Sequence, residues 1–193
     1  MIIRKLFKFE NAHIVRDCST LRCSQNIHGH SYKVEVLLES NYLDNGQMVY
    51  DFGLTKLYIK DIIDSFDHAI TLWNKDNKEY IKDMKKHSKR WIELPVSPSA
   101  EQFSRVFFIL IDKILSLSEF HNKEKNISLN SIIVHETDTG YAKCFRDDAY
   151  NQNMGDISLD KIKFSKEIKK EWRDKKMWKK IKQNKKLKFP TAI

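Results

Sequence analysis

The sequence predicts an α+β domain in which two helices cover one face of a four-stranded antiparallel sheet, followed by a basic helical extension. Three observations support this prediction. Strand-like segments lie near both ends of residues 1–150, segments with helical spacing lie between them, and the surplus of basic residues begins after residue 150. The predicted order is strand, strand, helix, helix, strand, strand.

Residues 4–15 and 28–40 predict the first two strands, because their side chains alternate in character as on a half-buried sheet. One parity of the first segment contains Phe7, Phe9, Asn11 and His13. One parity of the second contains His28, His30, Tyr32, Val34, Val36 and Leu38. The "DNG" triplet at 44–46 is a turn signal that ends this pair.

Two segments predict helices. Residues 54–66 repeat apolar side chains at helical spacing. Ser99, followed three residues later by Gln102, resembles a capping box and predicts a helix that continues to about Leu117. The polar residues 74–90 between them predict a partly helical surface excursion.

The last two strands are expected within residues 128–138 and 140–148, after a polar loop. No run approaches the ~20 apolar residues that a membrane span needs. We also expect no signal peptide, because the N-terminus has neither a long apolar core nor a small-residue cleavage site. Three cysteines without a CxxC pattern favour a reducing compartment over a disulfide framework. We therefore expect a cytoplasmic protein.

The formal net charge of +9 is located in residues 151–193, which hold 14 basic and 5 acidic residues. Phe164, Ile168 and Trp172 follow at helical spacing, and Trp178 and Ile181 continue the pattern after a break near 174–176. Such an amphipathic basic helix either docks on its own oligomer with a solvated lysine face or binds RNA, a membrane surface or a partner. We expect docking, and no membrane or nucleic-acid partner.

The stretch "RCSQNIHGHSY" at residues 22–32 concentrates possible metal ligands. On a strand, His28 and His30 share one face and can lean toward one metal, unless they are simply hydrogen-bonded strand residues. His13 would add a third nitrogen if the two strands pair, and three histidines with an open position are typical of catalytic zinc. A four-ligand zinc site with Cys18 and Cys23 is disfavoured, because the loop is too short and the histidine spacing is wrong.

Two further sites carry weaker signals. In "FDHAITL", Asp67 could orient His68 for proton transfer, although such pairs are common on surfaces. Glu136, at the end of an apolar strand, could hold a ligand through two N–H donors or could be an exposed strand-end residue. The residues alone leave both alternatives open.

Six motifs, "FENAH", "C-x4-HGHSY", "VYDFG", "FDHAITL", "PSAE" and "HETDTGYA", occur in one order along residues 1–150. In this order they resemble the 6-pyruvoyl-tetrahydropterin synthase / 6-carboxytetrahydropterin synthase family. The resemblance implies the tunnelling fold, with sheets paired into barrels, and a homohexamer built from two trimers with active sites between subunits. Residues 1–150 would be this domain and residues 151–193 the extension.

The resemblance also implies roles for individual residues. His13, His28 and His30 would hold zinc, Cys23 would be the catalytic thiol, and Asp67 with His68 would relay protons. Glu136 would anchor the pterin ring, and the segment Ser99, Ala100 and Glu101 would add pterin contacts. Ser99 stands where threonine is common in the family, which keeps the hydroxyl.

The implied activity is a zinc-dependent lyase reaction on 7,8-dihydroneopterin triphosphate. We expect 6-carboxy-5,6,7,8-tetrahydropterin, a precursor of queuosine, with release of acetaldehyde and triphosphate. The alternative product is the pyruvoyl compound of biopterin synthesis, which keeps the two side-chain carbons. A nucleic-acid-binding protein with a structural metal is the alternative from a different class.

Overall fold

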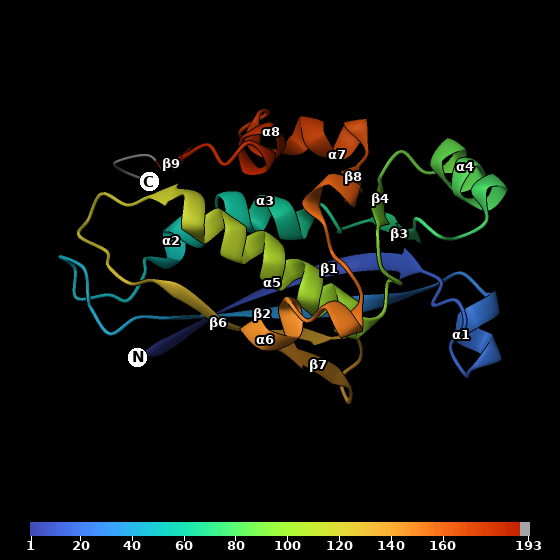
Figure 1. Ribbon diagram of the computed structural model, residues 1–193, viewed down its shortest axis with the longest axis horizontal. Coiled ribbons are helices and arrows are strands. Elements are labelled where there is room, and N and C mark those ends of the chain that lie inside the picture. The colour runs from blue at the N-terminus through green and yellow to red at the C-terminus, as the bar shows by residue number, and fades with distance from the viewer. Residues whose placement is uncertain (190–193) are drawn as a thin grey trace.

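A seven-stranded sheet forms the centre of the computed structural model, which describes residues 1–189 (Figure 1). Across the sheet the strands are β7 (Tyr141–Cys144), β6 (Ser128–His135), β2 (His28–Glu39), β1 (Ile2–His13), β3 (Ala69–Trp73), β4 (Trp91–Leu94) and β8 (Lys163–Phe164). The two long strands β1 and β2 lie in the middle, so each can pair on both sides.

The four expected strands are β1, β2, β6 and β7, and they form the antiparallel half of the sheet. The α+β class is therefore confirmed, but the sheet is larger than the predicted four strands. β3 pairs in parallel with β1 and with β4, and β8 adds an antiparallel edge. β3 and β4 were missed because they are runs of five and four residues, too short for periodicity to classify.

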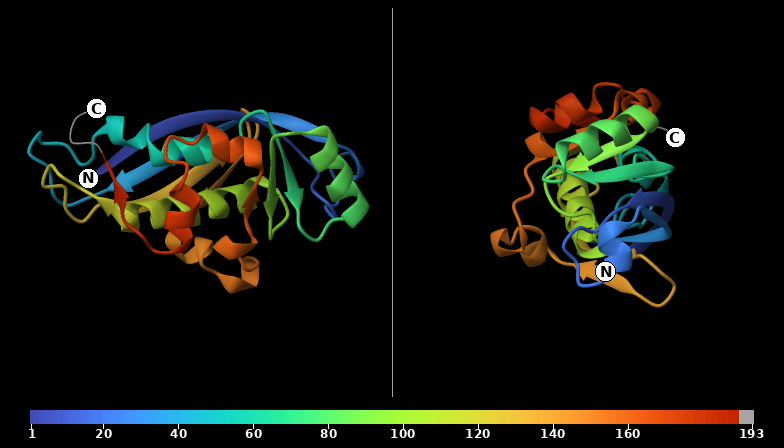
Figure 2. Two further views of the ribbon diagram at one scale, coloured as in Figure 1. Left: turned by 90° about the horizontal axis from the view of Figure 1, so that it is seen from above. Right: turned by 90° about the vertical axis from the view of Figure 1, so that its right-hand side faces the viewer.

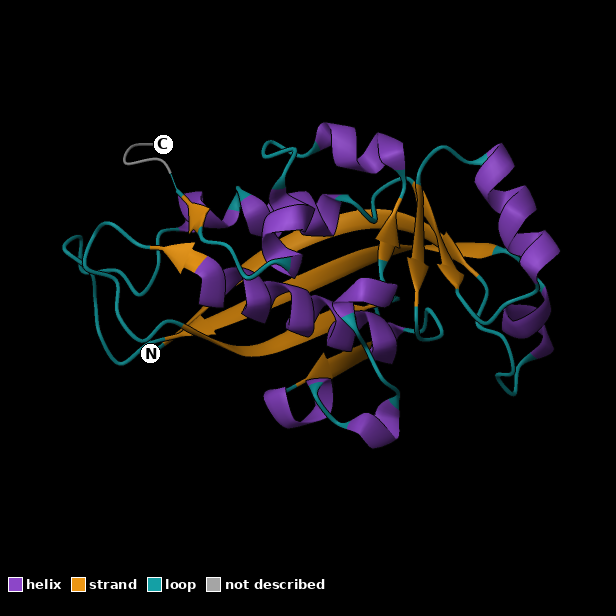
Figure 3. Ribbon diagram, turned by 45° about the horizontal axis from the view of Figure 1, so that its top comes forward, coloured by secondary structure: helices purple, strands orange, loops and turns teal. Residues whose placement is uncertain are grey.

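Helices cover one face of this sheet (Figure 3). The long helix α5 (Ala100–Leu117) contacts β6 and β7. Ser99 accepts a hydrogen bond from the backbone N–H of Gln102, which is one half of the expected capping box. The other half is not formed, because the Gln102 side chain bonds to Arg105 and Met154 instead. The other expected helix is divided into α2 (Phe52–Thr55) and α3 (Tyr58–Asp64). The shorter elements are α1 (Leu21–Gln25), α4 (Lys78–His87), α6 (Arg146–Ala149) and the 3₁₀ turns Gln152–Met154 and Leu159–Lys161.

Aromatic rings fill the space between the sheet and α5. Phe9 of β1 stacks on Tyr32 of β2 with ring centroids 4.8 Å apart. Phe66, Phe103 and Phe107 close this cluster from the helical layer. Because Tyr32 lies two residues from His30, the rigid core continues directly into the candidate site.

The basic extension folds back on its own chain (Figure 2). After β8 it forms α7 (Lys166–Glu171), α8 (Met177–Lys182) and β9 (Leu187–Lys188), which pairs with β5 (Ser118–Glu119). Ile168 and Trp172 are buried as the helical pattern predicted, whereas Phe164 belongs to a strand. The last four residues of the extension, 190–193, lie outside the described part of the chain.

The predicted surface excursion at 74–90 contains α4, which has no buried residue. It connects the parallel neighbours β3 and β4. Within residues 1–189, no helix combines the length and apolar character that crossing a lipid bilayer requires.

Candidate active site

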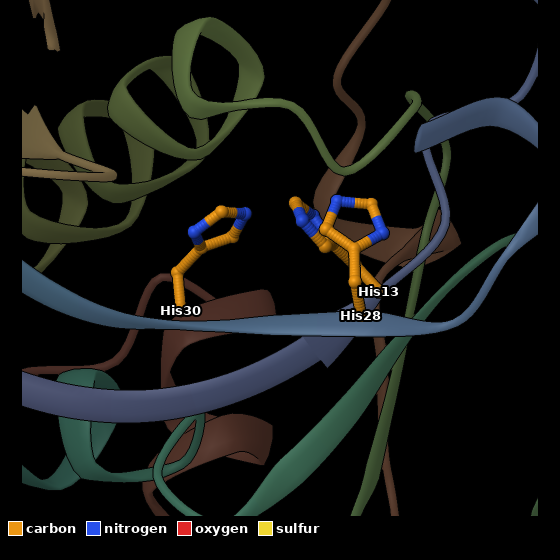
Figure 4. Close-up of side chains that lie close together, drawn as sticks. All are labelled: His13, His28 and His30. Carbon is orange, nitrogen blue, oxygen red and sulfur yellow. The ribbon is translucent and has the colours of Figure 1, made fainter. Parts of the chain in front are cut away.

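Strand pairing brings the three candidate metal ligands together. β1 and β2 pair so that His13 lies opposite His28, and Asn11 opposite His30. Strand alternation puts the three imidazoles on the side of the sheet where α5 lies (Figure 4). One nitrogen from each ring lies within 4.8 Å of the others. His13 was expected to add a third nitrogen only if its strand paired with the strand of His28 and His30, and the two strands do pair.

Gly29, between the two histidines of β2, permits this close pairing. A Cβ at this position would lie 3.0 Å from the carbonyl oxygen of Asn11 on β1. A side chain would therefore push the two strands apart where His13 and His28 face each other. Glycine at the centre of "HGH" therefore separates the two histidines and also leaves room for the neighbouring strand.

Backbone carbonyls orient two of the rings. Nδ1 of His13 lies 2.5 Å from the carbonyl oxygen of Pro98, and Nδ1 of His28 lies 3.0 Å from that of Asn26. A carbonyl only accepts, so each Nδ1 carries the proton and each Nε2 keeps its lone pair for a metal. Burial, with a smaller contribution from His28 and His30, lowers the pKa of His13 to about 4 despite the Pro98 hydrogen bond. His13 is therefore neutral at pH 7, as a metal ligand must be.

Glu136 and Tyr32 complete the wall of the cluster. One carboxylate oxygen of Glu136 lies 3.8 Å from Nε2 of His13 and equally far from Nε2 of His30. The Tyr32 hydroxyl donates to the same oxygen at 3.1 Å. Burial, followed by the charge of Glu136, raises the pKa of Tyr32, so its phenol stays protonated and available as a donor.

The predicted segment before and within the first turn of α5 borders this wall. Ser99 caps the helix, Ala100 is buried, and the Glu101 carboxylate is close enough to contribute to the raised pKa of Tyr32. Pro98 immediately precedes them and orients His13. The same loop therefore supports the histidine cluster and carries the side chains expected to contact substrate.

Asp67 and His68 form a pair in the turn between α3 and β3. Nδ1 of His68 lies 3.0 Å from the Asp67 carboxylate, whose other oxygen accepts from the Glu10 backbone N–H at 2.8 Å. The His68 side chain is 76% exposed and lines a cavity of about 440 Å³ with Glu10 and Ser31. Within residues 1–189, no hydrogen bond or ion pair joins this pair to the three histidines.

Cys23 lies in α1, immediately before β2, and is partly exposed. Its carbonyl accepts from Val15 N–H at 3.2 Å, which holds α1 beside the end of β1. In the described chain, its thiol makes no hydrogen bond to the histidine cluster. Cys18 is also free, and its thiol contacts only the nearby Thr20 carbonyl among described residues.

Sequence reasoning did not single out Asn11, Tyr32 or Pro98 as site residues. Asn11 and Tyr32 could have been found, because both lie on the same strand faces as the histidines. Pro98 acts through a backbone carbonyl, which carries no sequence signal.

Known proteins resemble this chain in sequence and in fold. The sequence model of the family described as 6-pyruvoyl tetrahydropterin synthase matches residues 2–147. A Helicobacter pylori (strain J99) protein named 6-carboxy-5,6,7,8-tetrahydropterin synthase is 42% identical over 182 residues, covering 94% of this chain and 91% of its own length. A Haemophilus influenzae protein of the same name is 28% identical and covers 73% of this chain and 96% of its own length.

Among solved structures, Plasmodium vivax 6-pyruvoyltetrahydropterin synthase superposes with a TM-score of 0.56 at 20% identity, covering 76% of this chain and 98% of its own. This likeness supports the fold. The chain belongs to the 6-pyruvoyl tetrahydropterin synthase family and is an enzyme of the tetrahydropterin synthase class. The match to the Helicobacter pylori relative reaches into residues 151–193, whereas the family model ends at residue 147.

Proposed function

We propose that this enzyme converts 7,8-dihydroneopterin triphosphate and one water molecule to 6-carboxy-5,6,7,8-tetrahydropterin, with release of acetaldehyde and triphosphate. The observation that carries the proposal is the cluster of His13, His28 and His30 beside Glu136, in a chain 42% identical to a protein named for that product. The proposed setting is queuosine biosynthesis in the cytoplasm.

The cluster fits a zinc ion. It offers three imidazole nitrogens, two of them on rings oriented through Nδ1 by backbone carbonyls, and neutral imidazole is a preferred zinc ligand. Zinc bound there would act as a Lewis acid that stabilises negative charge on substrate oxygens.

In the proposed mechanism, Glu136 holds the pterin ring by accepting from its N–H edge. Its Oε2 makes no hydrogen bond within residues 1–189, whereas Oε1 is held by Tyr32. Ser99, Ala100 and Glu101 add contacts to the ring. With the ring anchored in this way, the substrate side chain extends over the three histidines.

In the same proposal, Cys23, Asp67 and His68 transfer protons. Cys23, as thiolate, removes a proton from the substrate side chain, and His68, oriented by Asp67, carries protons to and from the reacting carbons. We propose a hexamer of two trimers with active sites between subunits, which allows neighbouring copies to bring these groups to one substrate.

A product assay tests the proposal. Zinc-loaded protein is incubated with 7,8-dihydroneopterin triphosphate, and the pterins are identified by mass spectrometry alongside zinc content. The carboxy product with acetaldehyde is expected, whereas a product that keeps the two side-chain carbons would place the enzyme in the pyruvoyl branch. Zinc-loaded protein that forms no pterin product would contradict the proposal.

The nucleic-acid alternative is tested on the same full-length protein. The apolar side chains of the extension are buried in the hydrophobic core that it shares with the rest of the chain. This burial favours a docked segment over a helix that is free to bind RNA. We expect only weak, salt-sensitive RNA binding in titrations at two salt concentrations. Tight RNA binding without pterin turnover would favour the alternative.

A further inference from the structure

Arg90 holds the turn that carries Asp67 and His68. Its Nε donates to the Asp67 carbonyl oxygen and its Nη2 to the Asp64 carbonyl oxygen, each at 2.9 Å. The side chain is 19% exposed, so most of it lies within the structure. One planar guanidinium therefore joins the end of α3 to the backbone of the proposed proton-transfer pair.

The third side of this guanidinium is held by the C-terminal extension. Nη1 of Arg90 donates to the carboxylate of Glu171, the last residue of α7. A carboxylate on one edge and two carbonyls on the others fit the fork geometry of arginine, which lysine cannot reproduce. The orientation of Arg90 thus depends on where α7 lies.

The residues that follow Glu171 hold the same end of α3. Trp172 is 2% exposed, and its indole N–H donates to the Ser65 hydroxyl at 2.8 Å. The backbone N–H of Arg173 donates to the Asp61 carboxylate at 2.9 Å. Trp172 and Arg173 therefore bind the segment that leads into Asp67 directly, and Glu171 acts on it through Arg90.

The turn itself has an uncommon backbone conformation. His68 has φ +49°, in the left-handed region that residues other than glycine seldom adopt. Strained turns persist where surrounding contacts hold them. Asn11 supplies contacts from the sheet side by donating to the carbonyls of Phe66 and Ala69, at 2.8 and 2.9 Å. Arg90 and the extension supply them from the other side.

We propose that the C-terminal extension is a positioning element for the Asp67–His68 pair, acting through Glu171 and Trp172 on Arg90 and the end of α3. The inference rests on the proposed function, because it assigns proton transfer to that pair. Arg90, Glu171 and Trp172 are positioning residues and do not touch substrate. The extension would thus serve turnover as well as stability.

Steady-state kinetics of Arg90→Met, Arg90→Lys and Glu171→Gln test the proposal. We expect Arg90→Met to lower kcat about 10- to 100-fold, because small displacements of a reacting group are costly, while KM and zinc content stay within about twofold. Arg90→Lys should recover only part of the loss. Glu171→Gln should lower kcat about two- to fivefold, as expected for a partly exposed ion pair.

Glu167→Gln is the matched control. Glu167 lies one turn earlier on α7 and pairs only with Lys170 among described residues, so it should leave kcat unchanged. Arg90→Met with kcat within twofold of the parent would overturn the proposal. So would a loss of kcat accompanied by loss of zinc, since that would indicate general disruption.

Hydrogen–deuterium exchange gives a readout that needs no turnover. Peptides covering residues 61–70 should exchange faster in Arg90→Met and Glu171→Gln than in the parent and Glu167→Gln, while peptides from β1 and β2 stay unchanged. Unchanged exchange at 61–70 would overturn the proposal. If the parent itself forms no pterin product, the proposed function fails, and faster exchange would still establish the coupling between the extension and the turn.

Discussion

The two halves of the candidate site are built in different ways. The histidine cluster comes from two adjacent long strands, and its rings are held by nearby backbone carbonyls. The Asp67–His68 pair lies in an exposed turn with a left-handed residue, held by side chains from distant parts of the chain. The proposed metal site is therefore specified by strand register, whereas placement of the proposed proton-transfer pair depends on the packing of the surface excursion at 74–90 and of the C-terminal extension. The following predictions test this division.

The largest effect is expected from removing a ligand. His30→Ala leaves two imidazoles, which should reduce zinc from about one ion per chain to a small fraction and abolish pterin turnover. Metal analysis of purified protein measures the first effect and the product assay the second. His121→Ala, at an exposed loop histidine, is the control. Full zinc occupancy in His30→Ala would contradict the assignment of the cluster.

Cys23→Ala should separate zinc binding from turnover. We expect zinc content to stay at the parent level while turnover falls about 10²- to 10⁴-fold, the usual contribution of a general acid–base group. Cys18→Ala, which removes the other partly exposed thiol, should stay within about twofold of the parent. Equal zinc loss in both cysteine variants would show that the thiols belong to the metal site.

Trp172→Ala should lower the free energy of unfolding by about 3–5 kcal/mol, as for other buried tryptophans. Trp172→Phe, which keeps an aromatic ring but loses the hydrogen bond to Ser65, should cost less. Urea denaturation of both variants measures these differences. Because the histidine cluster lies on β1 and β2, zinc content of the folded variants should be unchanged. Zinc loss at low urea would show that the two halves are not separable.

The smallest effect concerns Glu93, which joins β4 to Lys163 of β8 and to Lys85 of α4. Burial would raise the pKa of Glu93, but the two lysines outweigh burial and hold it below the ordinary value of 4.5. Since the folded-state pKa is lowered, the ionised group stabilises the fold above pH 4.5, and this contribution is lost as pH falls through the folded value.

Glu93→Gln should therefore lower the free energy of unfolding by about 1–2 kcal/mol at pH 7. The difference from the parent should shrink below pH 4.5. Urea denaturation across this pH range measures it. A difference that is constant with pH would show that the ion pairs do not stabilise this edge of the sheet.

Much of the metal half could be predicted from sequence. Alternation in residues 4–15 and 28–40 placed His13, His28 and His30 on common strand faces, and the structure pairs those strands as required. Helical spacing likewise placed Ile168 and Trp172 on one apolar side of the extension, and both are buried. These predictions succeeded because a period of two or 3.6 residues is a local property that burial on one side imposes on the sequence.

Only the tertiary structure determined which contacts hold the turn of the Asp67–His68 pair. Arg90, Glu171 and Asn11 meet around the turn at Asp67 and His68, although they come from the surface excursion at 74–90, the C-terminal extension and the first strand. Sequence spacing carries no information on such contacts, since each depends on how whole elements pack. The sequence by itself determined which histidines share strand faces and are candidate zinc ligands; packing across more than 150 residues of chain decided how the turn with Asp67 and His68 is held.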